Sequence, residues 1–163
     1  MISILLVDDY KPWRHLVCSM IRKEPELQVI CEVSDGLAAV QRAHESKPDL
    51  ILLDIGLPKL NGIEAARQIR QVSPNSKIVF FSTDNSVDVV QVALSTGASG
   101  YVYKANAQND LLPAINAVLR RKRFVSRLEG SKLTDAKRTK APRLNLSPVG
   151  TLFTTSLSEA EEL

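Results

Sequence analysis

The amino-acid sequence predicts an α/β protein built on a doubly wound parallel sheet. Short apolar runs alternate with segments of helical periodicity through the first three quarters of the chain. This alternation is typical of parallel strands joined by right-handed helical crossovers. Acidic, hydroxyl or lysine side chains also follow several of the apolar runs, at the strand ends where ligands bind in sheets of this class.

Five apolar runs have the length and composition of strands, being short and rich in Ile, Val, Leu or aromatic residues. They are Ile2–Val7, Leu27–Val33, Leu50–Leu53, Ile78–Phe81 and Tyr101–Tyr103. Five strands in a domain of this size predict the flavodoxin-like arrangement, with spatial order 2-1-3-4-5. That order leaves a crevice between the ends of strands 1 and 3.

Apolar residues recur at helical spacing between the strands. The five stripes are Trp13, Leu16, Val17, Met20 and Ile21; Leu37, Val40 and Ala43; Ile63, Ala66, Ile69 and Val72; Val87, Val90, Ala93 and Leu94; and Leu112, Ile115, Val118 and Leu119. Pro113 falls within the last stripe, and proline is best tolerated in the first turn of a helix. We therefore expect Asn109 to be the N-cap of that helix.

The composition is that of an ordinary soluble globular protein, with 44% apolar and 24% charged residues in a chain of 163. No apolar run approaches the roughly 18 to 20 residues that cross a bilayer. Met1 leads directly into a strand, without the pattern of a signal peptide. We therefore expect a cytoplasmic protein with no membrane partner, whose two cysteines, Cys18 and Cys31, stay reduced.

Charge divides the chain into two parts, because the net charge of +3 combines −2 up to Leu119 with +5 from Arg120 onward. We predict one domain over residues 1–126 and a flexible, basic tail over residues 127–163, where Ser158 and Glu161 could form a helix capping box. The basic charge could bind nucleic acid or anionic lipid, but cations also suit a helix C-terminus. Nucleic acid is therefore expected as a partner only through the tail.

Five polar residues follow predicted strands and should meet at one edge of the sheet: Asp8, Asp9, Asp54, Ser82 and Lys104. Three carboxylates placed together repel one another unless a cation neutralises them. Mg²⁺ binds carboxylates together with phosphate oxygens, and a carboxylate can act as a nucleophile toward phosphorus. A lysine and a hydroxyl would then stabilise the transferred phosphoryl group.

The chain resembles the receiver domains of two-component response regulators over residues 1–126. The matching segments, in order and spacing, are Leu6-Val7-Asp8-Asp9, Asp54-Ile55-Gly56-Leu57-Pro58, Asn61-Gly62-Ile63-Glu64-Ala65, Ser82-Thr83-Asp84 and Gly97-Ala98-Ser99-Gly100-Tyr101-Val102-Tyr103-Lys104. The Gly-Ala-Ser-Gly-Tyr stretch and Phe124-Val125-Ser126 are most similar to receivers that precede a LuxR-type helix-turn-helix domain.

The resemblance implies that Asp54 is the phosphoacceptor, receiving its phosphoryl group from a histidine kinase or a phosphotransfer protein. It implies that Asp9 and Asp54 ligate Mg²⁺ directly, with the backbone carbonyl of Gly56 as a third ligand. Asp8 would hold a metal-bound water or share in the ligation. Lys104 would pair with the phosphoryl oxygens.

The resemblance also implies a switch. Ser82 would move toward the phosphoryl group, and Tyr101 would turn inward into the vacated space, changing the face formed by the fourth helix, the fifth strand and the fifth helix. The positions two after the phosphoacceptor and two after the switch hydroxyl, Gly56 and Asp84, would tune autodephosphorylation. Many receivers have proline after the lysine, whereas Ala105 stands here and is expected to follow a trans peptide bond.

Other functions stay open. A LuxR-type DNA-binding domain needs about 60 residues, and only 37 follow Ser126. The chain could therefore be a DNA-binding regulator with a truncated or degenerate output region, or a phospho-independent adaptor. A phosphohydrolase resembling the haloacid-dehalogenase family is disfavoured, because Gly56 and Pro58 occupy positions where that family has Asp and Thr or Val. We expect no enzyme turnover; the downstream partner is not indicated, and a homodimer is compatible with the sequence.

Overall fold

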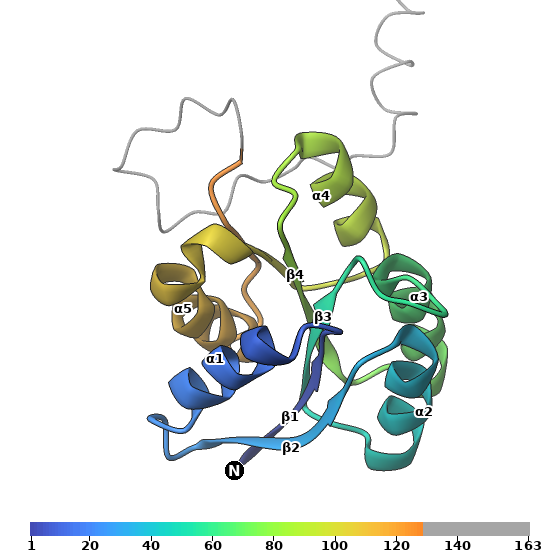
Figure 1. Cartoon of the computed structure of the whole chain (residues 1–163), viewed down its shortest axis with the longest axis horizontal. Helices are drawn as coiled ribbons and strands as arrows, with labels where there is room; N and C mark the ends of the chain where they lie inside the picture. Colours follow the sequence, from blue (N-terminus) through green and yellow to red (C-terminus); the bar gives the residue numbers. More distant parts are fainter. Residues whose placement is uncertain (129–163) are drawn as a thin grey trace, which may run out of the picture. The chain divides into compact units, whose positions relative to one another are not determined.

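The computed structural model describes residues 1–128. These residues form one parallel sheet in the order β2-β1-β3-β4-β5-β6, flanked by helices on both faces (Figure 1). The strands are β1 Ile2–Val7, β2 Leu27–Val33, β3 Leu50–Asp54, β4 Lys77–Ser82, β5 Gly100–Tyr103 and β6 Phe124–Val125. The helices are α1 Lys11–Ile21, α2 Gly36–Ser46, α3 Gly62–Val72, α4 Val87–Ser95, the 3₁₀ turn η1 Lys104–Asn106, and α5 Ala107–Leu119.

The predicted fold class and the order of the first five strands are confirmed. Residues 129–163, which hold almost all of the predicted tail and its Ser158–Glu161 capping box, lie outside the described residues. Within residues 1–128, every helix is too short or too polar to cross a membrane.

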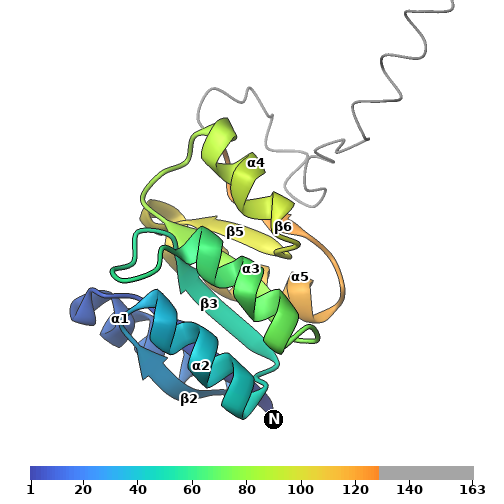
Figure 2. The ribbon, with the colours of Figure 1, turned by 90° about the vertical axis from the view of Figure 1, so that its right-hand side faces the viewer.

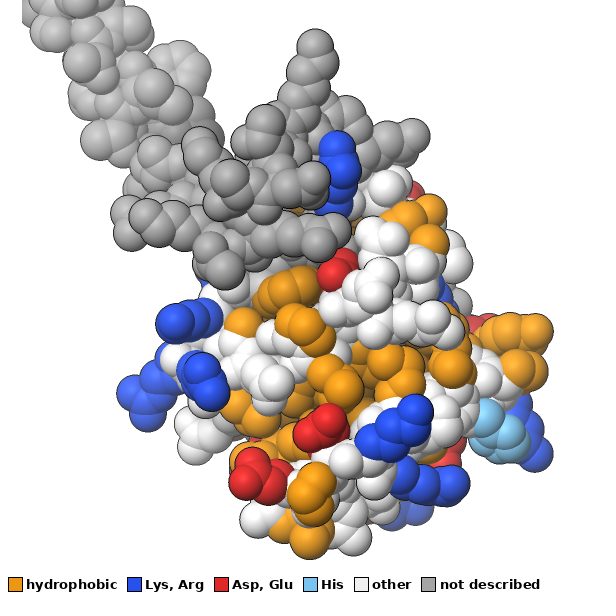
Figure 3. All heavy atoms as spheres, turned by 90° about the vertical axis from the view of Figure 1, so that its left-hand side faces the viewer, with side chains coloured by type: hydrophobic (Ala, Val, Ile, Leu, Met, Phe, Trp, Pro, Cys, Tyr) orange, Lys and Arg blue, Asp and Glu red, His pale blue; other side chains and the backbone are white. Residues whose placement is uncertain are grey.

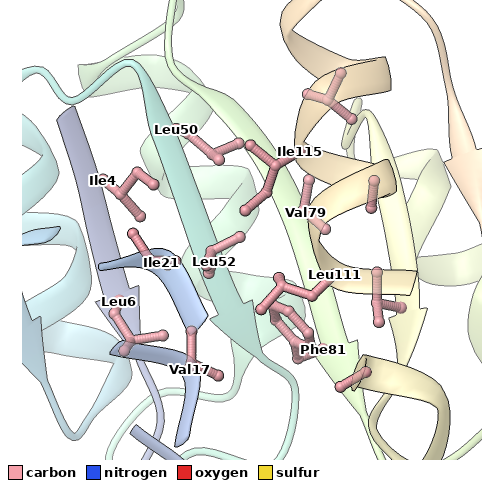
Figure 4. Packing of buried hydrophobic residues seen from close by; sticks show 14 of the residues in the cluster. Ile4, Leu6, Val17, Ile21, Leu50, Leu52, Val79, Phe81, Leu111 and Ile115 are labelled. Carbon is pink, nitrogen blue, oxygen red and sulfur yellow. The ribbon is translucent and has the colours of Figure 1, made fainter. Parts of the chain in front are cut away.

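Alternate residues of the central strands pack against opposite helical layers. On the α1 and α5 side, shown in Figure 4, Leu6 and Leu52 of the strands and Val17 and Leu111 of the helices belong to one buried cluster. The intervening residues of the same strands, such as Leu5 and Leu53, are also fully buried, and α2 and α3 lie on their side of the sheet (Figure 2). Burial on both faces explains why the strands read as continuous apolar runs.

The sixth strand was not predicted. It pairs in parallel with β5, and the Ser126 N–H that follows it donates to the Tyr101 carbonyl at 2.8 Å. The buried Ser126 hydroxyl accepts from the Tyr103 N–H at 3.0 Å and donates to Asp110 at 2.6 Å. A strand of two residues has no alternation to detect in a sequence, which is why only the structure reveals it.

The predicted start of α5 is wrong. The helix begins at Ala107, with Asn106 rather than Asn109 at the N-cap, and Pro113 lies in its interior. Ala107 and Leu111, which precede the predicted stripe by five residues and by one, are both buried, so packing against the sheet extends the helix toward its N-terminus. This burial outweighs the backbone hydrogen bond that the exposed Pro113 cannot donate.

Close packing fixes the loop that follows β3. Gly62, the first residue of α3, lies so near the strand end that a Cβ there would be 2.0 Å from the Asp54 carbonyl oxygen. Gly36, the first residue of α2, is equally close to the Leu60 carbonyl, at 1.9 Å. Asn61 accepts a capping hydrogen bond from Glu64 N–H at 3.0 Å. The two helices therefore hold the loop that begins at Asp54.

We predict that Gly62→Ala lowers the free energy of unfolding by about 2 kcal/mol, because its methyl group must displace backbone atoms. Urea unfolding without divalent metal measures the effect. Gly56→Ala is the matched control: it lies in the same loop, and a Cβ there meets no atom within 4 Å. Equal stabilities of the two variants would contradict the close approach.

Candidate functional site

Three acidic side chains meet at the C-terminal edge of the sheet. Asp54 is the last residue of β3, and Asp8 and Asp9 follow β1, which pairs with β3. One carboxylate oxygen from each of the three residues lies within 4.8 Å of the others. The sequence predicted this convergence, and the neighbouring positions of β1 and β3 produce it.

Lys104 joins the acids from the end of β5. Its Nζ lies 2.6 Å from Asp8 Oδ2 and 3.5 Å from Asp54 Oδ2, and its side chain is 13% exposed. One ammonium balances only part of the charge of three carboxylates. The site therefore favours an additional cation.

Asp54 is a buried carboxyl whose residue is only 8% exposed. Burial raises its pKa above the usual 3.8, and the negative charge of Asp8 acts in the same direction. The Lys104 ammonium and a hydrogen bond from the Ile55 N–H, 2.8 Å from Oδ1, oppose this rise. Without a further cation, ionisation of Asp54 is thus less favourable than that of an ordinary aspartic acid.

Asp8 is positioned by its own loop and by α1. Its Oδ1 accepts from the Tyr10 N–H at 2.8 Å, while its backbone carbonyl accepts from Arg14 at 2.7 Å. Arg14 also lies 3.3 Å from Glu32 on β2. The sequence analysis missed this role of Arg14; its place one turn into the helix after Asp8-Asp9 is the signal that could have indicated it.

Ser82 and Tyr101, the two predicted switch residues, are linked through Asp84. The Ser82 hydroxyl accepts from the Asp84 N–H at 3.0 Å, and the Tyr101 hydroxyl donates to the Asp84 carbonyl. Both residues are buried, and the Tyr101 ring takes the inward position. Burial raises the pKa of the Tyr101 hydroxyl, so it remains a donor at neutral pH.

The site is open on the side of Asp9 and Gly56, both of which are exposed. The Asp84 carboxylate accepts from Ser86 N–H at 2.8 Å, which lowers its pKa, so it points toward the start of α4. The peptide bond between Lys104 and Ala105 is trans, as predicted.

The donor set fits a hard divalent cation such as Mg²⁺, which prefers carboxylate oxygens and retains several waters. The three acids offer oxygens at mutual distances that one ion can span. Asp9 is exposed while Asp8 and Asp54 are buried, so such an ion could reach the site from solvent.

A parallel α/β domain with an acidic site at the ends of β1 and β3, and a lysine at the end of β5, defines a phosphoacceptor class of signalling domain. The family model of the response regulator receiver domain matches residues 4–116. The chain belongs to this family, and its domain is a receiver of two-component signal transduction, as the sequence analysis predicted.

Individual proteins with similar sequences are response regulators or transcriptional regulators. The nitrate/nitrite response regulator protein NarL of Escherichia coli (strain K12) is 39% identical over 114 residues, covering 70% of this chain and 53% of NarL. The transcriptional regulatory protein DegU of Brevibacillus brevis is 37% identical over 117 residues, covering 72% of this chain and 50% of DegU. The chain thus spans about half the length of these curated relatives.

A solved structure supports the predicted subtype. The two-component response regulator of the LuxR family from Aurantimonas sp. SI85-9A1 superposes with a TM-score of 0.73 and is 34% identical, covering 76% of this chain and 89% of that one. The predicted likeness to receivers of LuxR-type regulators is confirmed.

We predict that Asp54→Asn is more stable than the wild type at neutral pH when divalent metal is absent. Because the pKa of Asp54 is raised, the folded protein keeps this proton at pH values where the unfolded chain has lost it. The contribution of Asp54 to wild-type stability therefore falls as pH rises above 3.8, the usual value, and the advantage of Asp54→Asn grows. Urea unfolding of both proteins between about pH 3 and pH 7 tests the prediction; a difference that shrinks with rising pH would contradict it.

Proposed function

We propose that Asp54 accepts a phosphoryl group from the phosphohistidine of a histidine kinase or a phosphotransfer protein, in a Mg²⁺-dependent reaction. The observation that carries the proposal is the meeting of Asp54, Asp8, Asp9 and Lys104 at one sheet edge. The domain over residues 1–126 would be the receiver, and residues 127–163 a separate tail.

In this reaction an Asp54 carboxylate oxygen forms the new bond to phosphorus as the nitrogen–phosphorus bond of phosphohistidine breaks. The imidazole leaves with the bonding electron pair, and the product is an aspartyl phosphate. Lys104, already 3.5 Å from Asp54 Oδ2, is close enough to pair with the oxygens of the transferred group. The Ile55 N–H holds the other carboxylate oxygen and so orients the nucleophile.

Asp8, Asp9 and Asp54, with the Gly56 carbonyl, are the groups we assign to the metal. Bound Mg²⁺ would supply neutralisation of the charge on the acids and on the phosphoryl oxygens. The raised pKa of Asp54 supports this assignment, because the carboxylate becomes easier to ionise once a cation offsets its burial and its acidic neighbours.

Switching would begin at Ser82. To reach a phosphoryl group on Asp54, its hydroxyl must give up the bond to the Asp84 N–H. The Asp84 carbonyl also accepts a hydrogen bond from the Tyr101 hydroxyl. Movement of the loop from Ser82 to Asp84 would therefore change the position of the Tyr101 side chain. This coupling would carry the phosphorylation signal to α4, β5 and α5.

The output is proposed to be contact with another protein, with turnover limited to self-catalysed phosphorylation and dephosphorylation. A cytoplasmic location suits a receiver that meets its kinase there. A homodimer through the face formed by α4, β5 and α5 is compatible with this function. The relatives DegU and NarL are longer regulators, so a DNA-directed output in a longer form of this protein is the second candidate.

Intact-mass measurement after incubation with a small-molecule phosphodonor and Mg²⁺ tests the proposal. We predict one added phosphate on the wild type and none on Asp54→Asn. Asp88→Asn, which changes an exposed acid in the first turn of α4, is the control and should be labelled like the wild type. Labelling of Asp54→Asn would point to another acceptor, and no labelling of any protein would favour a phospho-independent adaptor.

We further predict that Gly56→Asn shortens the lifetime of the phosphorylated protein roughly tenfold, a modest part of what a positioned polar group can contribute. Gly56 has open space around its Cα, so an amide there can orient a water toward the phosphorus. Loss of label after removal of the phosphodonor gives the lifetime, and Gly56→Ala controls for the loss of backbone freedom. If phosphorylated Gly56→Asn has the same lifetime as the phosphorylated wild type, the side chain at this position does not limit dephosphorylation.

A further inference from the structure

We infer that Trp13 is a positioning residue for Lys104: the indole face holds the ammonium beside Asp54. This inference deepens the proposed function and rests on it for the role of Lys104. Trp13 lies in the first turn of α1, four residues after Asp9.

The ring faces the lysine directly. Lys104 Nζ lies 5.1 Å from the centroid of the Trp13 ring, within the range in which an aromatic face attracts a cation. Asp8 and Asp54 contact the same ammonium at 2.6 Å and 3.5 Å. The ammonium is thus surrounded by two carboxylates and one aromatic ring, and its side chain is largely removed from water.

The ring is itself fixed by the strand beside Asp54. Trp13 and Phe81 make an edge-on contact, with centroids 5.8 Å apart and planes inclined by 66°. Phe81 is buried on β4 and is the register partner of Asp54 on β3. Two aromatic rings in contact, Trp13 and Phe81, therefore link the Lys104 ammonium to the strands β3 and β4, and β3 carries Asp54.

Core packing alone does not account for tryptophan at this position. Its indole N–H is buried and has no hydrogen-bond partner within residues 1–128, and such an orphaned donor destabilises the fold. A leucine or phenylalanine at this position would carry no such donor. What tryptophan adds is the strongly cation-attracting face of its ring, which meets Lys104.

The face matters because Lys104 is closer to Asp8 than to Asp54. Where the Asp8 oxygens are engaged by a cation, Lys104 loses part of its nearest partner. The indole then keeps the ammonium near Asp54 without occupying the carboxylate oxygens. Trp13 is half-buried and packs against the buried cluster between the sheet and helices α1 and α5. Figure 3 shows the molecule from the side of these two helices, where hydrophobic side chains gather between charged ones.

Trp13 is the only tryptophan in the chain, so its fluorescence reports this contact without a phosphodonor. Lys104→Met should raise the emission of Trp13, because an ammonium group in contact with indole quenches it. Lys77→Met, at the opposite end of the sheet, should leave the emission unchanged. Titration with Mg²⁺ alone should alter the wild-type emission, and this response should be reduced in Lys104→Met.

Two substitutions at Trp13 distinguish the effect of an aromatic ring face from the effect of side-chain size. At saturating Mg²⁺, Trp13→Leu should be phosphorylated by a small-molecule donor about tenfold more slowly than the wild type, whereas Trp13→Phe, which keeps a ring face, should lie within about threefold. Urea unfolding of both variants shows whether folding is retained.

Equal slowing of the Leu and Phe variants, or wild-type rates in both, would overturn the inference. Identical emission of Lys104→Met and Lys77→Met would overturn it as well. If the wild type takes up no phosphate, the proposed function fails. The fluorescence comparison still decides whether Trp13 holds Lys104, because it uses no phosphodonor.

Discussion

The electrostatic balance among three carboxylates and one ammonium at a single sheet edge determines the chemistry of this domain. The order β2-β1-β3 places the ends of β1 and β3 side by side, so Asp8, Asp9 and Asp54 cannot avoid one another. Lys104 offsets only part of this charge. The buried apolar sheet supplies the stability that holds these acids together, and the remaining negative charge favours an additional cation at the site.

The surrounding elements restrict how this charge can be relieved. Gly36 and Gly62 allow α2 and α3 to press against the loop after β3, so Asp54 cannot swing away with its backbone. Arg14 holds the Asp8 carbonyl from α1. Movement is left to side chains and to the loop after β4, where Asp84 is bonded to both Ser82 and Tyr101. The proposed switch would therefore act through the loop after β4, beside acids that their neighbours hold in place.

The order of the first five strands and the meeting of the acids could be predicted from the sequence. Continuous apolar runs mark strands that are buried on both faces, and polar residues at the ends of these strands share one edge of the sheet. The prediction failed where a feature depends on tertiary packing. The α5 start at Ala107 is set by burial against the sheet, and β6 by hydrogen bonds to β5. The contact between Trp13 and Lys104 joins residues far apart in the chain, so no local pattern contains it.

The pairing of β6 with β5 has a consequence for association between molecules. An unpaired edge strand offers its backbone to other chains, and short or covered edges are the protection that natural sheets use. Here β6 pairs with β5 at Gly100 and Tyr101, and the Ser126 hydroxyl accepts a hydrogen bond from the Tyr103 N–H. Within residues 1–128, the last strand on that side of the sheet has two residues. The strand that leads into Lys104 is thereby shielded from edge-to-edge polymerisation.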